Sequence, residues 1–370
     1  MGRRRLLRLL GLATVAGLAP AWAGRVLAAA PVFPAVRPRP LVFPRDHGAH
    51  PDFRTEWWYA TGWLETPAGA AGFQITFFRS RSEHDAANPS RFAPHQLLFA
   101  HAALAWPGES RLRHEQRAAR VIASDSGASY GETDTDLSLA GWRFLRDAGD
   151  GGYRGEAAGD ELDLQLVLRP TQPLLLQGEA GYSRKGPGPD QASYYYSRPQ
   201  LAVTGRAGPA GRPLPVTGRA WLDHEWSTSV LDAAAVGWDW LGVNLEDGGA
   251  LMAFRIRGRD GPDRWAAACL RRADGSERRY GPGEVSFEAT GRWRSPHSSA
   301  TYPVRGRLHL GQSASRLSFD YGPLLDDQEI DARASTGGIY WEGAVRLTAG
   351  RRLAGRGYLE LVGYHRAMRL

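Results

Sequence analysis

Apolar and polar residues alternate along many short stretches of this chain. In residues 162–168, leucine occupies every second position, and Asp, Gln and Val stand between the leucines. A period of two residues is the pattern of a β-strand with one buried face. Residues 73–79 alternate in the same way, and a turn at 67–72 separates them from an aromatic, strand-like segment that begins at Glu56. This part of the sequence predicts a β-hairpin.

Similar strand-like segments recur over the rest of the chain, for example at 96–104, 137–144 and 200–206. Turn-forming residues mark their ends, and the chain is rich in glycine (45) and proline (24). Long helical periodicity is missing, and only residues 112–123 suggest a short helix. The pattern predicts an all-β protein, and 370 residues are enough for two hydrophobic cores.

The second half of the sequence repeats the first. The closing strand at 218–223 matches residues 355–360, and the opening hairpin recurs before it. The matched pairs of the hairpin are Leu64-Glu65 with Leu245-Glu246, Trp57 with Trp238, Tyr59 with Trp240, and Phe78-Arg79 with Phe254-Arg255. Such a repeat predicts two consecutive antiparallel β-barrels over 45–228 and 232–370.

The repeat fails at one chemically interesting place. After the matched carboxylates Asp223 and Glu360, the first copy continues with His224, Glu225 and Trp226, whereas the second continues with Leu, Val and Gly. His224 is therefore the leading candidate site residue. In an alternating strand, Asp223 and Glu225 face the side opposite to His224. The alternative is that His224 is a buried, hydrogen-bonded residue that joins the barrels.

Two further charged residues are candidates with a structural alternative. Asp239 stands between two tryptophans, and a carboxyl group buried among aromatic rings is a weak acid. It could instead pair with an arginine at the junction of the barrels. Arg79 could orient the polar end of a ligand, or it could form a fixed internal ion pair with Glu56.

Composition excludes several classes of function. The formal charge is +7, but five arginines lie in the first 30 residues, which contain no acid, so the remaining chain carries +2. No basic cluster with interleaved aromatic residues follows, which argues against nucleic acid as a partner. Cys269 is the single cysteine, so no internal disulfide or cysteine-based metal site can form. His47 and His50 lack an evident third ligand, and we expect neither metal nor cofactor.

The N-terminus has the pattern of an export signal over residues 1–30. It combines a basic start, an apolar run at 6–18 and small residues. Its arginines resemble a twin-arginine signal, Sec export is the alternative, and cleavage could follow Ala23 or Ala28. A proline-rich, extended lead-in is expected at 31–44. We therefore expect a periplasmic or secreted protein without a transmembrane segment in the mature chain.

Six motifs resemble the AttH / CrtC family. They lie at 50–59, 73–79, 181–186, 194–199, 221–226 and 237–240. The resemblance implies a secreted protein with two lipocalin-like (calycin-type) barrels and a long apolar ligand. The family includes carotenoid 1,2-hydratases (hydroxyneurosporene synthase), predicted secreted hydrolases and proteins that belong with an ABC export system.

The hydratase branch carries a D-H-x-W element, which Asp223, His224 and Trp226 match. That branch also has a Tyr-x-Asp pair further along the chain. The corresponding residues here, 250–254, contain neither Tyr nor Asp. The resemblance therefore leaves the general acid of a hydratase unassigned.

These observations support three functional hypotheses. The first is an exported protein that binds a long hydrophobic, lipid- or isoprenoid-like molecule, with ABC transporter components as expected partners. The second is a hydratase-like enzyme that adds water to an apolar alkene by acid–base catalysis. The third is a scaffold for an ABC exporter. The candidate catalytic residues are His224, Asp223, Asp239 and Glu225. The candidate ligand-binding residues are Trp57, Tyr59, Arg79, Tyr195, Trp221, Trp226, Trp238 and Trp240.

Overall fold

The computed structural model describes residues 31–84, 88, 90, 93–122, 127–229, 231, 233–259 and 261–368. The export signal expected at 1–30 lies outside these residues. The expected lead-in at 31–44 has no regular secondary structure, and a short 3-10 turn, η1 (Arg45–His47), follows it. No helix in the described part of the chain is long and apolar enough to cross a membrane.

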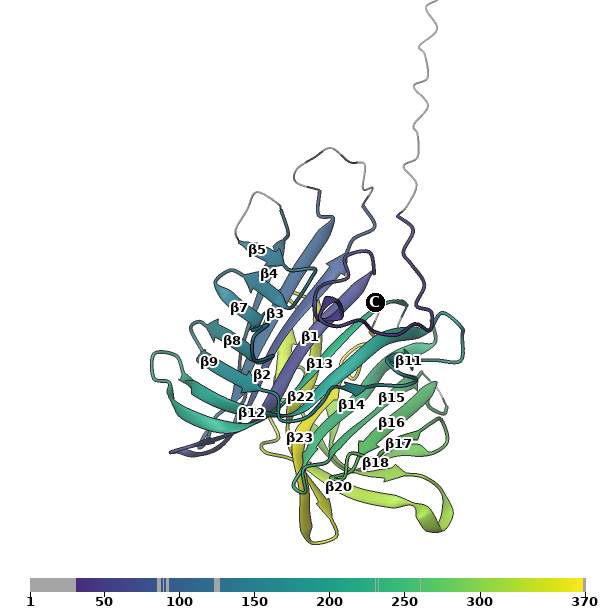
Figure 1. The fold of residues 1–370 in the computed structure, drawn as a ribbon. Helices are drawn as coiled ribbons and strands as arrows, with labels where there is room; N and C mark the ends of the chain where they lie inside the picture. The colour runs from purple at the N-terminus through teal and green to yellow at the C-terminus, as the bar shows by residue number, and fades with distance from the viewer. Residues whose placement is uncertain are drawn as a thin grey trace, which may run out of the picture.

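The first sheet has thirteen strands among the described residues and runs in the order β4-β3-β2-β1-β13-β12-β9-β8-β7-β6-β5, with β10 and β11 paired to β12. It curves into a nearly closed barrel (Figure 1). Its strands are β1 (Thr55–Thr66), β2 (Gly69–Arg81), β3 (Gln96–Ala105), β4 (Arg113–Arg120), β5 (Ala128–Tyr130), β6 (Asp136–Leu139), β7 (Trp142–Arg146), β8 (Tyr153–Ala158), β9 (Leu162–Arg169), β10 (Leu175–Leu176), β11 (Tyr182–Arg184), β12 (Ala192–Pro209) and β13 (Leu214–Ser229).

The second sheet has ten strands in the described residues and the order β17-β16-β15-β14-β23-β22-β20-β19-β18, with β21 paired to β22. It forms a half-barrel beside the first sheet (Figure 1). Its strands are β14 (Ala235–Leu245), β15 (Ala250–Gly258), β16 (Trp265–Arg271), β17 (Glu277–Tyr280), β18 (Val285–Arg294), β19 (Thr301–Leu310), β20 (Leu317–Pro323), β21 (Glu329–Ala332), β22 (Gly338–Ala349) and β23 (Arg352–Leu361). A 3-10 turn, η2 (Ser313–Ser315), precedes β20.

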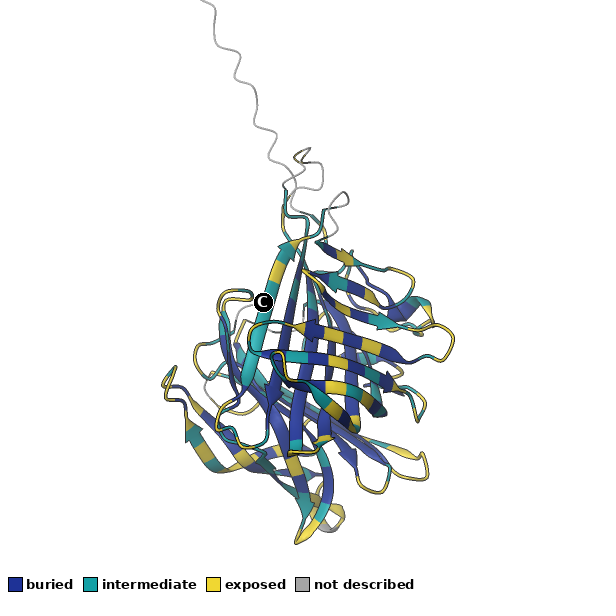
Figure 2. Cartoon of the chain, turned by 90° about the vertical axis from the view of Figure 1, so that its left-hand side faces the viewer, coloured by how far each residue is buried: buried dark blue, intermediate teal, exposed yellow. Residues whose placement is uncertain are grey.

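The all-β prediction with two consecutive barrel units is confirmed. The first sheet ends at Ser229 and the second begins at Ala235. Strands with one buried face follow the predicted alternation: in β9, the four leucines are buried, and β8 alternates strictly between buried and exposed residues (Figure 2). The domain boundaries at 45–228 and 232–370 stay a prediction.

Strand register shows how the repeat is built. In both sheets the first strand pairs with the last, so Tyr59 lies opposite Asp223 and Trp240 lies opposite Glu360. The expected match of Phe78 with Phe254 is wrong by two residues. Phe78 lies opposite Trp57, and the residue opposite Trp238 is Ile256. The turn between the hairpin strands differs in length between the copies, and the size of this difference could not be determined from the sequence alone.

The helix expected near 112–123 is wrong. Residues 113–120 form strand β4, which pairs antiparallel with β3, and no α-helix occurs in the described residues. The segment is rich in Arg, Ala, Glu and Gln, which favour helices. Pairing with the edge of the sheet overrides that local preference, because tertiary hydrogen bonding decides strand formation.

The two units pack face to face through an apolar layer. Each barrel has its own core, and a third cluster joins them, with Tyr59 and Trp221 from the first sheet and Trp240 and Tyr358 from the second. The Trp63 indole donates a hydrogen bond to the carbonyl of Gly357 across this layer (2.9 Å). The first and last strands of both sheets therefore meet at the centre of the molecule, where the candidate site lies.

Candidate functional site

Strands β1 and β13 sort the candidate residues onto two faces. Their register places Trp58 opposite His224 and Trp57 opposite Glu225. Since side chains alternate along a strand, His224 lies on one face of the sheet with Trp58, and Asp223 and Glu225 lie on the other. The second face is the one that meets the other barrel.

A cavity of about 1030 Å³ opens at this junction. Residues of β1, β2 and β13 form one wall, and residues of β14, β15 and β23 form the other. This volume lies at the upper end of the range of ligand pockets, which is about 300–1000 Å³. Aromatic side chains dominate the deep part of the wall. They include Trp57, Tyr59, Phe78, Trp238, Trp240 and Phe254.

Asp223 lies in the cavity wall, and both of its carboxylate oxygens accept hydrogen bonds from neighbouring side chains. Its Oδ1 accepts hydrogen bonds from the hydroxyl of Ser197 (2.5 Å) and the indole of Trp221 (2.6 Å). The Tyr195 hydroxyl donates to Oδ2 (2.6 Å) and accepts from the Trp240 indole (3.0 Å). Burial raises the pKa of Asp223 to about 7, although these donors oppose the shift. Asp223 therefore holds a proton near neutrality, and the same donors stabilise the carboxylate once the proton leaves.

Glu360 faces the same cavity from β23. The Trp238 indole donates a hydrogen bond to its Oε2 (2.9 Å), and burial raises its pKa to about 7. Glu342 lies directly opposite on β22, and burial together with the charge of Glu360 raises its pKa well above the ordinary value. Asp223 and Glu360 are thus two weak acids that line one cavity from different barrels. The charge of Asp223 is one of the causes that raise the pKa of Glu360.

The negative charge of Glu225 is balanced by the only lysine of the chain. Lys185 lies after β11, and its Nζ is 2.9 Å from Glu225 Oε1, with both side chains buried. The same Nζ lies 4.6 Å from the ring centroid of Tyr195 and 4.2 Å from that of Phe254. Both ionic groups line the cavity, so its deep part holds a neutralised pair rather than a net charge.

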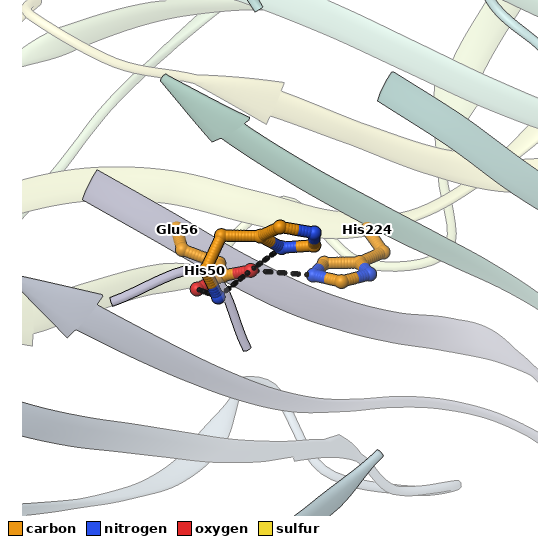
Figure 3. Close-up of side chains that lie close together, drawn as sticks. All are labelled: His50, Glu56 and His224. Carbon is orange, nitrogen blue, oxygen red and sulfur yellow. Dashed lines mark hydrogen bonds and ion pairs between the residues drawn. The ribbon is translucent and has the colours of Figure 1, made fainter. Parts of the chain in front are cut away.

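His224 belongs to a separate, fully buried network on the other face of β13 (Figure 3). Its Nε2 donates to Glu56 Oε1 (2.9 Å), and its Nδ1 lies 3.2 Å from the Tyr196 hydroxyl. Its ring stacks on Trp58, with centroids 4.5 Å apart. Burial lowers the pKa of His224 to about 4, even though Glu56 opposes the shift. His224 is therefore neutral at pH 7.

Glu56 is the centre of that network and resembles a metal ligand only superficially. The ligand atoms of His50, Glu56 and His224 lie within 4.8 Å of one another. However, Glu56 Oε1 is already 2.7 Å from His50 Nδ1, whereas ligands around a tetrahedral zinc ion are spaced about 3.3 Å apart. The Arg79 guanidinium also donates to Glu56 Oε2 (2.8 Å) and brings a positive charge. The residues fit a hydrogen-bonded ion-pair network better than a metal ion.

The same network keeps the buried Glu56 carboxyl ionised. Burial would raise the pKa of its carboxyl, but His50 and Arg79 hold it well below the usual value. Arg79 also donates to the backbone carbonyls of His50 (3.0 Å) and Phe53 (2.9 Å). The ion pair considered as the alternative for Arg79 is therefore present, although Arg79 also lines the cavity.

Asp239 is likewise engaged in ion pairs. Its Oδ2 accepts from Arg255 (2.8 Å) and its Oδ1 from Arg257 (3.0 Å). The Tyr364 hydroxyl adds a third donor (2.9 Å). This is the arginine pairing that was the alternative to a catalytic role, and Asp239 does not line the cavity.

The structure brings together part of the predicted site. Of the candidate residues, Asp223, Glu225, Trp57, Tyr59, Arg79, Trp238 and Trp240 line the cavity. His224 and Trp226 lie on the other face of β13, and Trp226 stacks on the His50 ring (3.8 Å between centroids). Tyr195 and Trp221 hold Asp223 from behind the wall. Their functional roles stay predictions, but the grouping of His224 with the cavity acids does not occur.

Two important cavity residues escaped sequence reasoning. Glu360 appeared in the sequence only as the repeat partner of Asp223. That match was the available signal, because a residue equivalent to a candidate acid is itself a candidate acid. Lys185 lies in the polar motif at 181–186 and was not considered as a site residue, and its being the only lysine was the signal available.

A G-x-S-x-G sequence at 127–131 has the spacing of a serine-hydrolase nucleophile elbow. Such an elbow needs a sharp turn between a strand and a helix. Ser129 instead lies within strand β5, opposite Ser138 of β6. The spacing therefore carries no nucleophile here.

The fold and the aromatic cavity between the sheets define a lipocalin-like protein of two barrel units. The chain belongs to the AttH-like family, whose sequence model matches residues 34–364. The crystal structure of a provisionally assigned AttH protein from Nitrosomonas europaea is 50% identical, with a TM-score of 0.83, and the match covers 90% of this chain and all of that chain.

More distant structures share the fold. Kievitone hydratase from Nectria haematococca is 15% identical, with a TM-score of 0.65 over 91% of this chain and 98% of its own. CghA is 14% identical, with a TM-score of 0.52 over 93% and 97% of the two chains. At these identities the likeness shows the fold alone. No protein with a curated description matches the chain.

Proposed function

We propose that this protein binds a long, mainly apolar molecule in the cavity between its two barrels. The observation that carries the proposal is the cavity of about 1030 Å³ with aromatic rings contributed by both sheets. Burial of an apolar ligand there gains roughly 25 cal/mol per Å² of apolar surface removed from water. The paired Lys185 and Glu225 add no net charge that would oppose such a ligand.

Asp223 and Glu360 support a second function, acid–base catalysis on an apolar alkene. Both carboxyls have pKa values of about 7, so near neutrality one can hold a proton while the other is ionised. The protonated acid would transfer its proton to one alkene carbon, and the π electron pair would form the new C–H bond. Aromatic faces such as Trp240 would stabilise the resulting cation. Water would then attack the cation and release its proton to the second carboxylate.

This proposal gives the acid and base roles to Asp223 and Glu360 in the cavity wall and none to His224. The distant likeness to a protein named a hydratase shows only that this fold can belong to a hydratase. Location and export partners rest on the sequence alone. We propose that the chain is exported, works in the periplasm or outside the cell, and handles its ligand together with an ABC export system.

Native mass spectrometry of protein from its own compartment, followed by organic extraction, tests the binding function. We expect an apolar adduct in one-to-one ratio. Protein that stays empty after gentle purification, and that takes up no apolar probe, would refute binding in the cavity.

Incubation of the adduct with fresh protein separates carrier from hydratase. A gain of one water mass indicates hydration, and an unchanged adduct favours a carrier. Asp223→Asn should then lower turnover by about a hundredfold or more while the adduct remains. Asp320→Asn, which changes a half-exposed acid that pairs with Arg307 and does not line the cavity, is the matched control and should leave turnover unchanged.

A further inference from the structure

The cavity has two chemically different ends. Residues at the deep end are buried, and they include Tyr59, Asp223 and Trp240. The outer end lies where strands finish and the wall becomes exposed. Four arginines of the described chain line this end: Arg54 and Arg81 at the open end of the β1–β2 hairpin, Arg333 in the turn before β22, and Arg366 near the C-terminus. We call these four residues the arginine mouth.

The arginine mouth is only weakly neutralised. Arg54 pairs with Glu83 (2.9 Å), whose side chain is 65% exposed. Arg81 is 3.7 Å from Asp52, which is 85% exposed. Ion pairs with such exposed carboxylates contribute about 0–1 kcal/mol, so either guanidinium can exchange its carboxylate partner at little cost, while Arg81 keeps its hydrogen bond to the Asp52 carbonyl (3.0 Å).

The other two arginines differ in how far their charge is compensated. Arg333 donates two hydrogen bonds to Asp331 (2.8 and 2.5 Å), so its charge is largely balanced in place. Arg366 donates to the backbone carbonyl of Gly337 (3.4 Å), a neutral partner. Of the carboxylates that line the outer end in the described chain, Glu83 is the one that opposes these charges.

The deep end offers nothing for an anion. Its cation, Lys185, is already paired with Glu225. Asp223 and Glu360 become negative as pH rises through about 7, and an anion beside them would be repelled. A charged group on a ligand is therefore stable at the mouth and unstable at the deep end, whereas an apolar chain is stable at the deep end.

We propose that the ligand is an amphipathic anion, with a long apolar chain inside the cavity and a carboxylate-type head group at the arginine mouth. This inference rests on the proposed binding function and adds the chemical class and the orientation of the ligand. Arginine suits such a head group because its guanidinium donates two parallel hydrogen bonds to a carboxylate.

The test compares two probes that differ only in the head group, hexadecanoic acid and 1-hexadecanol. Binding to the full chain is followed by the fluorescence of the cavity tryptophans at about pH 8, where a fatty acid is ionised. We expect the acid to bind roughly five- to tenfold more tightly than the alcohol. The preference should shrink as salt is raised, because the mouth is solvent-exposed.

The double variant Arg81→Gln, Arg366→Gln should abolish the preference and leave affinity for the alcohol unchanged. Arg307→Gln is the matched control, because Arg307 is a half-exposed arginine paired with Asp320 on β19–β20, away from the cavity. It should retain the preference.

Several results would overturn the proposal. Equal affinity for both probes would refute the proposed preference for an anionic head group, but it would still support binding of an apolar chain in the cavity. A preference that survives the double variant but disappears in Lys185→Met would place the head group at the deep end. Failure of both probes to bind would refute the proposed binding function itself.

Discussion

Asp223 and Glu360 occupy equivalent positions in the two barrels and face one shared cavity. Each lies on the last strand of its sheet, opposite an aromatic residue of the first strand: Tyr59 for Asp223 and Trp240 for Glu360. Burial raises the pKa of each carboxyl to about 7. Because the repeat brings both acids into one low-dielectric space, the charge of the cavity changes close to neutral pH.

The first prediction concerns stability and pH. The pKa of Glu360 is 4.5 in the unfolded reference and about 7 in the fold, so the folded state binds the proton more tightly. Its contribution to stability is therefore fully present below pH 4.5 and is lost as pH rises through about 7. Glu360→Gln keeps an acceptor for the Trp238 indole and removes the titration. Relative to the native protein, the variant should gain up to about 3 kcal/mol between acid and slightly alkaline pH.

Urea unfolding at about pH 5 and about pH 8 measures this difference as a change in the free energy of unfolding. Glu246→Gln, a half-exposed glutamate at the end of β14, serves as the control and should show the same effect at both pH values. If Glu360→Gln also shows no pH dependence, the carboxyl does not titrate near neutrality.

The second prediction separates His224 from the cavity. His224→Ala removes the hydrogen bond to buried Glu56 and the stack on Trp58. Loss of a hydrogen bond to a charged group costs about 1.5–3 kcal/mol, and the cavity left by the imidazole adds to this cost. Since His224 does not line the cavity, affinity for an apolar probe in the folded protein should stay within about twofold. Chemical unfolding and a probe titration measure the two effects on the same variant.

The pH profile gives this variant a second signature. The pKa of His224 falls from 6.5 to about 4 on folding, so its contribution is present above pH 6.5 and is lost as pH falls through about 4. His224→Ala should lose this part of the acid sensitivity. His297→Ala, which changes a largely exposed histidine, should keep it. Lost turnover with unchanged stability in His224→Ala would instead favour the catalytic role that the sequence suggested.

Much of the architecture was predictable because it depends on local pattern. Alternation along 162–168 and 73–79 fixed strands and faces, and it correctly separated His224 from Asp223. The repeat predicted two barrel units and the equivalence of Asp223 with Glu360. The site itself was less predictable, since the cavity depends on which faces of two separate sheets meet. Strand register within the hairpins, missed by two residues at Phe254, also depends on turn length rather than on side-chain pattern.

The third prediction concerns metal ions at His50, Glu56 and His224. Because Arg79 already compensates Glu56 and the histidines donate to it, a Zn²⁺ ion would have to displace several hydrogen bonds. Added Zn²⁺ should leave Tm unchanged, and a chelator should have no effect on protein as purified. A rise of several degrees that is lost in His50→Ala would show that the network opens to bind metal.

The last prediction tests the cavity wall through a glycine. A Cβ on Gly242 would lie 2.4 Å from the Trp240 ring and 3.3 Å from the Trp221 ring. Gly242→Ala must therefore displace Trp240, which donates to Tyr195 and so supports Asp223. Overpacking of this kind costs about 1–3 kcal/mol, and the shifted ring should also weaken binding of an apolar probe.

Gly322→Ala is the matched control, because Gly322 also lies in a strand and a Cβ there meets no atom within 4 Å. It should change the free energy of unfolding by less than about 0.5 kcal/mol and leave probe binding intact. Unfolding and probe titration of the two variants then distinguish a packed cavity wall from a general effect of alanine in a strand. Equal behaviour of both variants would mean that Trp240 can move freely, and the cavity would then be adaptable rather than preformed.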